Sequence, residues 1–178
     1  MSRASVVPSL HRSVLLLALL AARLPAVLQA QAAPEPATSH KGLFLTLGVG
    51  YGSVECSDCS GEGGVSPMFE VGGWLSPTLQ LGFGAHASIG GGDGVASAGP
   101  VLTVYVEKAS RIYFTALAGV AAEFTESIYL GFGGSATVGY ELPISRSLAL
   151  APYVGVDFRT IGEEGFTGVS VGVALRLP

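Results

Sequence analysis

Two cysteines three residues apart, Cys56 and Cys59, form the sharpest chemical motif of the 178-residue sequence. A C-x-x-C pair occurs in redox dithiols, in zinc sites and in disulfides. A tetrahedral zinc site is not completed here, because the sequence has no second C-x-x-C and no histidine near the pair. No βαβ pattern typical of thioredoxins surrounds it. A structural disulfide is the expected state of two cysteines in an exported protein, and residues 1–32, described below, predict export. We therefore predict a disulfide between Cys56 and Cys59 and no metal site.

His86 and Ser88 form a second pair with chemical potential. A histidine beside a serine activates the hydroxyl as a nucleophile when a carboxylate assists. Both residues fall on the less apolar face of the same alternating segment, which we expect to point inward, whereas an enzyme that acts on lipid needs its site on the outward face. No carboxylate is in register on that outward face. We therefore predict a protein without enzymatic activity and keep a serine–histidine enzyme as an alternative.

A third group consists of charged side chains on the less apolar face of the alternating segments. Charges that are buried must be paired or hydrogen-bonded. We therefore predict an interior polar network in which Glu141 pairs with Arg176, and Glu70 is the diagonal neighbour of His86 on the adjacent strand. The predicted network comprises Glu70, His86, Glu107, Glu141, Asp157 and Arg176.

The elements that must position these residues follow from a period of two, which dominates the sequence from residue 42 onward. We predict eight strands, at residues 42–52, 67–75, 79–89, 98–107, 111–122, 127–142, 147–158 and 166–177. Tight turns at 76–78, 108–110 and 143–146 alternate with longer links, of which the polar stretch 53–66 is the first.

Two local expectations follow from this strand pattern. The first tight turn is expected to pair Leu75 with Leu79, and in that register Trp74 lies opposite Gln80, so that like faces stay together. Pro152 falls inside the seventh strand, where it removes a donor from the ladder of hydrogen bonds, and we expect a bulge there.

The composition of the two faces decides what surrounds the strands. One face is a nearly unbroken series of Leu, Val, Ile, Phe and Ala, and the other is mostly Gly, Ser, Ala and Thr. A soluble barrel such as a lipocalin would need a far more polar outer face, whereas small residues suit the narrow lumen of eight strands. Ten residues tilted by about 45° span about 23 Å, close to the apolar band of about 25 Å in an outer membrane. We predict an all-β fold: an eight-stranded, antiparallel, up-and-down transmembrane β-barrel.

The chain is predicted to contain three segments. Residues 1–32 have a basic start, a short apolar run and the small-x-small sequence Ala30-Gln31-Ala32, as a cleavable signal peptide does. Residues 33–41 form a Pro-rich periplasmic leader, and 42–178 form the barrel. Six basic and thirteen acidic residues follow residue 32, a net charge of −7 that argues against nucleic acid as a partner.

The charges divide between the two ends of the predicted barrel. With the tight turns in the periplasm, one end carries the basic residues Lys41, Lys108, Arg111, Arg146 and Arg176. The other carries the acidic residues Glu55, Asp58, Glu62, Asp93, Glu123, Glu126, Glu163 and Glu164. No EF-hand pattern is present, so we expect a solvated acidic surface.

Eight strands of this length, the segment APYVGVDFRT (151–160) and the alternating last strand resemble the small outer-membrane β-barrel domains of the OmpA/OmpX type. The resemblance covers about residues 42–177. It implies that the protein is exported to the bacterial outer membrane, contacts outer-membrane lipid and lipopolysaccharide, and is inserted by the barrel-assembly machinery.

The function expected from these observations is that of a monomeric barrel with a packed polar lumen, no cofactor, and a structural or surface-interaction role in the cell envelope. A narrow, porin-like pore for small solutes is the first alternative. The second is an outer-membrane enzyme that modifies lipid A, with His86 and Ser88 as its reactive residues.

Overall fold

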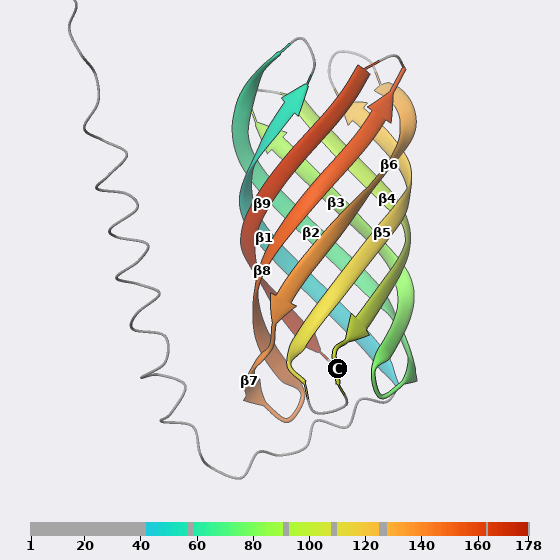
Figure 1. Cartoon of the computed structure of the whole chain (residues 1–178), viewed down its shortest axis with the longest axis vertical. Coiled ribbons are helices and arrows are strands. Elements are labelled where there is room, and N and C mark those ends of the chain that lie inside the picture. The colour runs from blue at the N-terminus through green and yellow to red at the C-terminus, as the bar shows by residue number, and fades with distance from the viewer. Residues whose placement is uncertain are drawn as a thin grey trace, which may run out of the picture. The chain divides into compact units, whose positions relative to one another are not determined.

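The alternating sequence folds into strands that wind around a common axis (Figure 1). The structure is a computed structural model, and it describes residues 42–56, 59–90, 93–107, 110–124, 128–162 and 164–177. The predicted signal peptide at 1–32 and leader at 33–41 lie outside the described residues. Among the described residues, no helix is long and apolar enough to cross a membrane.

Within the described residues the strands follow one another around the barrel. They are β1 (Leu43–Cys56), β2 (Cys59–Ser76), β3 (Leu79–Gly90), β4 (Asp93–Tyr105), β5 (Ile112–Phe124), β6 (Ile128–Tyr140), β7 (Leu142–Ser145), β8 (Leu148–Ile161) and β9 (Glu164–Leu177). From β1 to β6, consecutive strands pair antiparallel, and β6 then pairs with β8. The last strand, β9, pairs with both β8 and β1. The four-residue β7 continues the line of β6 along β8. The predicted eight-stranded up-and-down barrel is confirmed, because β6 and β7 together occupy one of the eight strand positions.

Burial alternates along the strands as the two predicted faces require. In β8, Val154 and Val156 are each 49% exposed, whereas Tyr153, which precedes Val154, is only 5% exposed. The same alternation puts Leu, Val, Ile and Phe on the outside of the other long strands. A closed sheet with an apolar exterior and a partly polar interior is the arrangement found in transmembrane barrels.

The register confirms one expectation and corrects another. Trp74 lies opposite Gln80, as predicted. Leu75 does not pair with Leu79, because a bulge after Trp74 brings Ser76 opposite Leu79 instead. A bulge adds one residue on one strand and sharpens the local twist, which suits the entry to a tight turn.

The strands are longer than predicted at one end of the barrel. The stretch 53–66, predicted as a link, is mostly strand: β1 continues to Cys56, and β2 begins at Cys59. In the same way β4 begins at Asp93 rather than at residue 98. Polar residues and glycines interrupt the apolar alternation there without interrupting the pairing, because the ladder is formed by backbone N–H and C=O groups whatever the side chains are. We call this end the upper end, and the end with the turn at 76–78 the lower end (Figure 1).

Pro152 is accommodated without the predicted bulge. The register between β8 and β9 runs through the pair Pro152 and Val173 without a shift. On the other side, the β6–β8 pairs stop at Tyr153 and the β7–β8 pairs resume at Leu150. The missing N–H of Pro152 therefore coincides with the break between β6 and β7, which ends the predicted strand 127–142 at Tyr140.

Large inward side chains lie over glycines of neighbouring strands. A Cβ atom on Gly48 would meet Met68, one on Gly139 would meet the ring of Tyr113, and one on Gly50 would meet the hydroxyl of Tyr153. The high glycine content therefore makes room for a few large side chains in a narrow lumen.

We predict that Gly139→Val destabilises the barrel by about 1–3 kcal/mol, because the new side chain must displace the Tyr113 ring. Gly165→Val is the matched control, since a Cβ there has nothing within 4 Å; its effect should stay within about 0.5 kcal/mol. Urea unfolding in detergent, followed by the fluorescence of the one tryptophan, Trp74, measures both. Equal effects of the two substitutions would contradict the packing described here.

Candidate functional site

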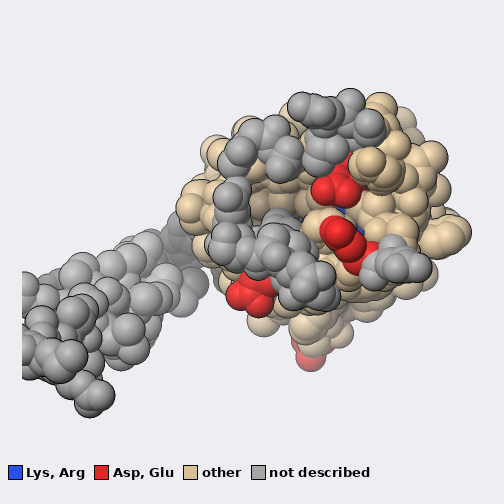
Figure 2. All heavy atoms as spheres, turned by 90° about the horizontal axis from the view of Figure 1, so that it is seen from above, with Lys and Arg blue, Asp and Glu red and all other residues tan. Residues whose placement is uncertain are grey.

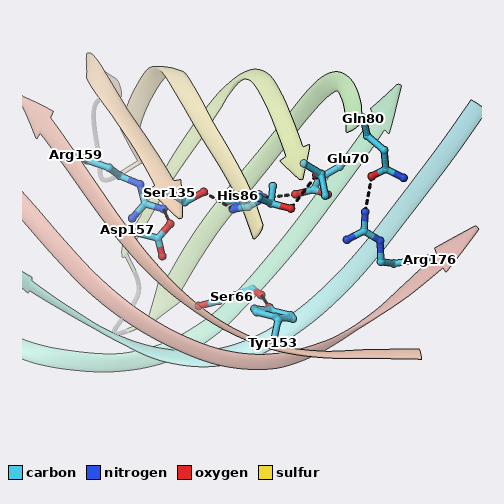
Figure 3. A network of polar contacts seen from close by, with 11 residues as sticks. Ser66, Glu70, Gln80, His86, Ser135, Tyr153, Asp157, Arg159 and Arg176 are labelled. Atoms are coloured by element: carbon cyan, nitrogen blue, oxygen red, sulfur yellow. Dashed lines mark hydrogen bonds and ion pairs between the residues drawn. The ribbon is translucent and has the colours of Figure 1, made fainter. Parts of the chain in front are cut away.

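The charged side chains that face inward lie in three groups along the lumen. In each group at least one hydrogen bond or ion pair joins side chains from different strands. Glu70, Glu141, Asp157, Arg159 and Arg176 are all at most 9% exposed. Figure 3 shows the side chains of this network reaching toward one another from different strands.

The lower group is built around Arg176, near the end of β9. Its Nε lies 3.2 Å from Oε1 of Glu141, and its Nη2 donates to Oε1 of Gln80 at 2.7 Å. The guanidinium carbon lies 4.0 Å from the centre of the Tyr113 ring, a cation–π distance. Tyr105 donates its hydroxyl hydrogen to the same Glu141 oxygen at 2.5 Å. One cation thus ties side chains from several strands across the lower lumen.

Glu141 reaches this group from the break between β6 and β7. Its backbone N–H donates to the carbonyl of Arg111 at 2.8 Å, so the chain remains anchored to the neighbouring strand although the ladder with β8 is interrupted. The carboxylate that pairs with Arg176 thus comes from the same break in the ladder that coincides with Pro152.

The middle group is a chain of three side chains centred on His86. Its Nε2 lies 3.2 Å from Oε1 of Glu70, and its Nδ1 lies 2.8 Å from Oγ of Ser135 (Figure 3). Met68 is the cross-strand partner of His86 and Glu70 is two residues further along β2, so His86 and Glu70 are diagonal neighbours. Ser135 comes from β6, on the other side of the lumen.

The composition serine, histidine and glutamate is that of a hydrolase triad, yet the geometry encloses it. Ser135 is 4% exposed, His86 is 7% and Glu70 is 0%. Both nitrogens of His86 are engaged by Glu70 and Ser135 rather than by Ser88, the serine singled out from the sequence. A nucleophile in this position is sealed from any lipid outside the barrel.

The upper group pairs Arg159 with Asp157 on β8. Nη2 of Arg159 lies 3.4 Å from Oδ1 of Asp157, and its Nε donates to Oγ of Ser97 across the lumen at 3.0 Å. Sequence reasoning missed Arg159, because the seventh strand was ended at Phe158. The alternation in the sequence indicates its position, since Tyr153, Asp157 and Arg159 are separated by even numbers of residues and so lie on the same, inward face of the strand.

Two predictions from the sequence fall outside this network. Glu107 is exposed and follows β4, which ends at Tyr105 rather than at residue 107, so its assignment to the lumen is corrected. Cys56 and Cys59 are cross-strand partners at the upper tip of the β1–β2 hairpin. Their side chains lie outside the described part of the structure, so the disulfide stays a prediction.

Two clusters of buried apolar side chains accompany the polar groups in the lumen. Met68, Tyr105, Tyr113 and Tyr153 pack together in one cluster, and a second cluster holds the side chains Val95, Ala121, Ile161 and Phe166. Beside His86 and Ser135 lies a cavity of about 10 Å³, barely enough for one water molecule. Within the described residues, no group of three His, Cys, Asp or Glu side chains is placed to hold a metal ion.

Comparison with known proteins places this fold among small outer-membrane barrels. Neisserial surface protein A superposes with a TM-score of 0.58 at 11% sequence identity, covering 76% of this chain and 96% of that one. Ail, the attachment invasion locus protein of Yersinia pestis, superposes with a TM-score of 0.52 at 7% identity, covering 77% and 99%. No protein-family model and no curated protein sequence matches the chain. The eight-stranded barrel predicted from the sequence is thus the fold of known outer-membrane proteins.

We predict that Arg176→Met lowers the free energy of unfolding by roughly 3 kcal/mol, because it leaves Glu141 buried without its cation. Arg146→Met, in an exposed turn, is the control and should change it by at most about 0.5 kcal/mol. Heat-modifiable gel migration and urea unfolding report the loss. A similar response to both substitutions would show that the lower group does not hold the barrel closed.

Proposed function

We propose that this protein is a closed, non-conducting β-barrel of the bacterial outer membrane, exported through its signal peptide, that acts without enzymatic activity and presents its upper hairpins at the cell surface. The packed lumen is the observation that carries this proposal. Salt-bridged and hydrogen-bonded side chains cross the lumen at three levels, and two clusters of buried apolar side chains fill further parts of it.

The outer face supports residence in a membrane. Large apolar side chains point outward from all the long strands, and Phe83, Phe114 and Val171 are each more than half exposed. In water such a surface drives association, whereas in a bilayer it contacts lipid chains. Closure of β1 onto β9 leaves no free strand edge for pairing with a second copy, which favours a monomer surrounded by outer-membrane lipid.

The upper end supports a role at the surface. A strand of 14 residues, the length of β8 and β9, rises about 33 Å when tilted by about 45°. This exceeds the apolar band of about 25 Å, so the upper strand ends stand clear of the hydrocarbon as a rigid rim. Acidic side chains gather around this rim in the view from above (Figure 2), and those described include Glu55, Glu123 and Glu164.

That orientation also suits the charges at the lower end. Arg111 and Arg146 lie by the tight turns of the lower end, which faces the periplasm in this proposal. Contacts of the acidic rim with cationic groups, or with lipopolysaccharide phosphates through divalent cations, are the interactions that its charge favours.

We predict that the purified protein shows no stable unit conductance in a planar bilayer in concentrated KCl, because Arg176 and its partners block the lower lumen. An open porin recorded under the same conditions is the positive control. Reproducible steps from the wild-type protein would overturn the closed barrel and favour the alternative of a narrow pore.

We predict that lipid A is unchanged by this protein, because the only histidine–serine contact described is sealed in the lumen. Mass spectrometry of lipid A compares cells that express the wild type, His86→Ala, Ser88→Ala or Ser135→Ala with cells that lack the protein. A lipid A species present with the wild type and lost with any of the variants would establish the enzymatic alternative.

A further inference from the structure

Four polar atoms deep in the lumen have no hydrogen-bond partner among the described residues. They are Oγ1 of Thr46, Oε2 of Glu70, the hydroxyl of Tyr113 and Nη1 of Arg176. The residues are 1%, 0%, 1% and 3% exposed, respectively. A buried polar atom without a partner loses its hydration and gains nothing in return, so four in one small lumen call for a common explanation.

The register places three of these residues side by side. Thr46 on β1 has Glu70 as its cross-strand partner on one side and Arg176 on the other. Cross-strand partners on one face have Cβ atoms about 5 Å apart, so the two long charged side chains flank the threonine hydroxyl. Tyr113 joins the same region, because its ring lies 4.0 Å from the guanidinium carbon of Arg176.

The remaining hydrogen-bonding capacity of the two charged groups is specific. Oε1 of Glu70 is taken by His86, while Nε and Nη2 of Arg176 are taken by Glu141 and Gln80. What is left is one acceptor on the carboxylate and one donor group on the guanidinium. The hydroxyls of the neighbouring Thr46 and Tyr113 are able to donate or accept.

This combination selects the chemistry of the ligand. A cation is repelled by Arg176, and an anion is repelled by Glu70. A small neutral molecule that both donates and accepts satisfies both, and water offers two donors and two acceptors. We propose that one or two ordered water molecules bind here, donating to Glu70 and accepting from Arg176, with Thr46 and Tyr113 as the further partners.

Bound water at this position joins two groups that direct contacts leave separate. The lower group contains Glu141, Arg176 and Gln80, and the middle group contains Glu70, His86 and Ser135. Figure 3 shows Glu70 and the Gln80–Arg176 pair in the same stretch of lumen. The water completes one hydrogen-bonded chain from the lower mouth to the far wall at Ser135.

The test is nuclear magnetic resonance of the full barrel in detergent micelles, with arginine and threonine side chains labelled. We expect nuclear Overhauser contacts between long-lived water and the side-chain protons of Arg176 and Thr46 in the wild type. Thr46→Val removes one partner and should weaken the Arg176 contact severalfold. Thr103→Val is the matched control, because its hydroxyl is already bonded to Thr115 at 2.8 Å, and it should leave that contact unchanged.

A crystal structure of the wild type keeps the proposal testable if Thr46→Val does not fold. Density for water within about 3 Å of Glu70 Oε2 and Arg176 Nη1 supports the proposal. A direct Glu70–Arg176 ion pair in that structure overturns it, as does a folded wild type without long-lived water at Arg176. Neither result bears on conductance, so the inference and the closed-barrel function fail independently.

Discussion

Inside hydrocarbon, each backbone N–H and C=O must find its partner within the protein, since neither lipid nor water supplies one. The pairing of β1 with β9 meets this requirement, because it turns a sheet with two open edges into a cylinder with none. Once the cylinder is closed, each strand has one face toward lipid and one toward the lumen. The alternation of apolar and small or polar residues is the consequence of that closure.

Closure with only eight strands creates the second constraint. The lumen is too narrow for bulk water, and its side chains are too polar for a purely apolar core. Glycines on one strand admit a large side chain from the next, as at Gly139 beneath Tyr113. Charged groups then meet across the axis, with Arg176 and Arg159 each bound by partners from other strands. In the closed barrel that we propose, the packing that stabilises the cylinder is also the packing that blocks passage through it.

Periodicity in the sequence was sufficient to predict the barrel, its two faces and the pairing of Trp74 with Gln80. It failed where the physical rule behind it no longer applied. The strand ends at the upper end carry polar residues and still pair, so the prediction of a link at 53–66 is wrong. Arg159 is missed because the predicted strand stops at Phe158, whereas β8 continues to Ile161. Glu107 was assigned inward because β4 was extended past Tyr105. The Ser135–His86 contact joins residues 49 apart in the sequence, and no local pattern reports such a meeting.

The position of Arg176 near the end of the last strand has a consequence for how the molecule assembles. Its partner Gln80 lies 96 residues earlier in the chain, so the lower group forms only after the final strand has docked beside the first. Contacts of such long range make folding slow, because the ordering of the intervening chain precedes the energy that rewards it. Until the last strand has docked, Glu141 and Gln80 lack the contacts that they make with Arg176 in the folded barrel. The Arg176–Glu141 salt bridge therefore forms only in a closed barrel, and its formation reports that closure is complete.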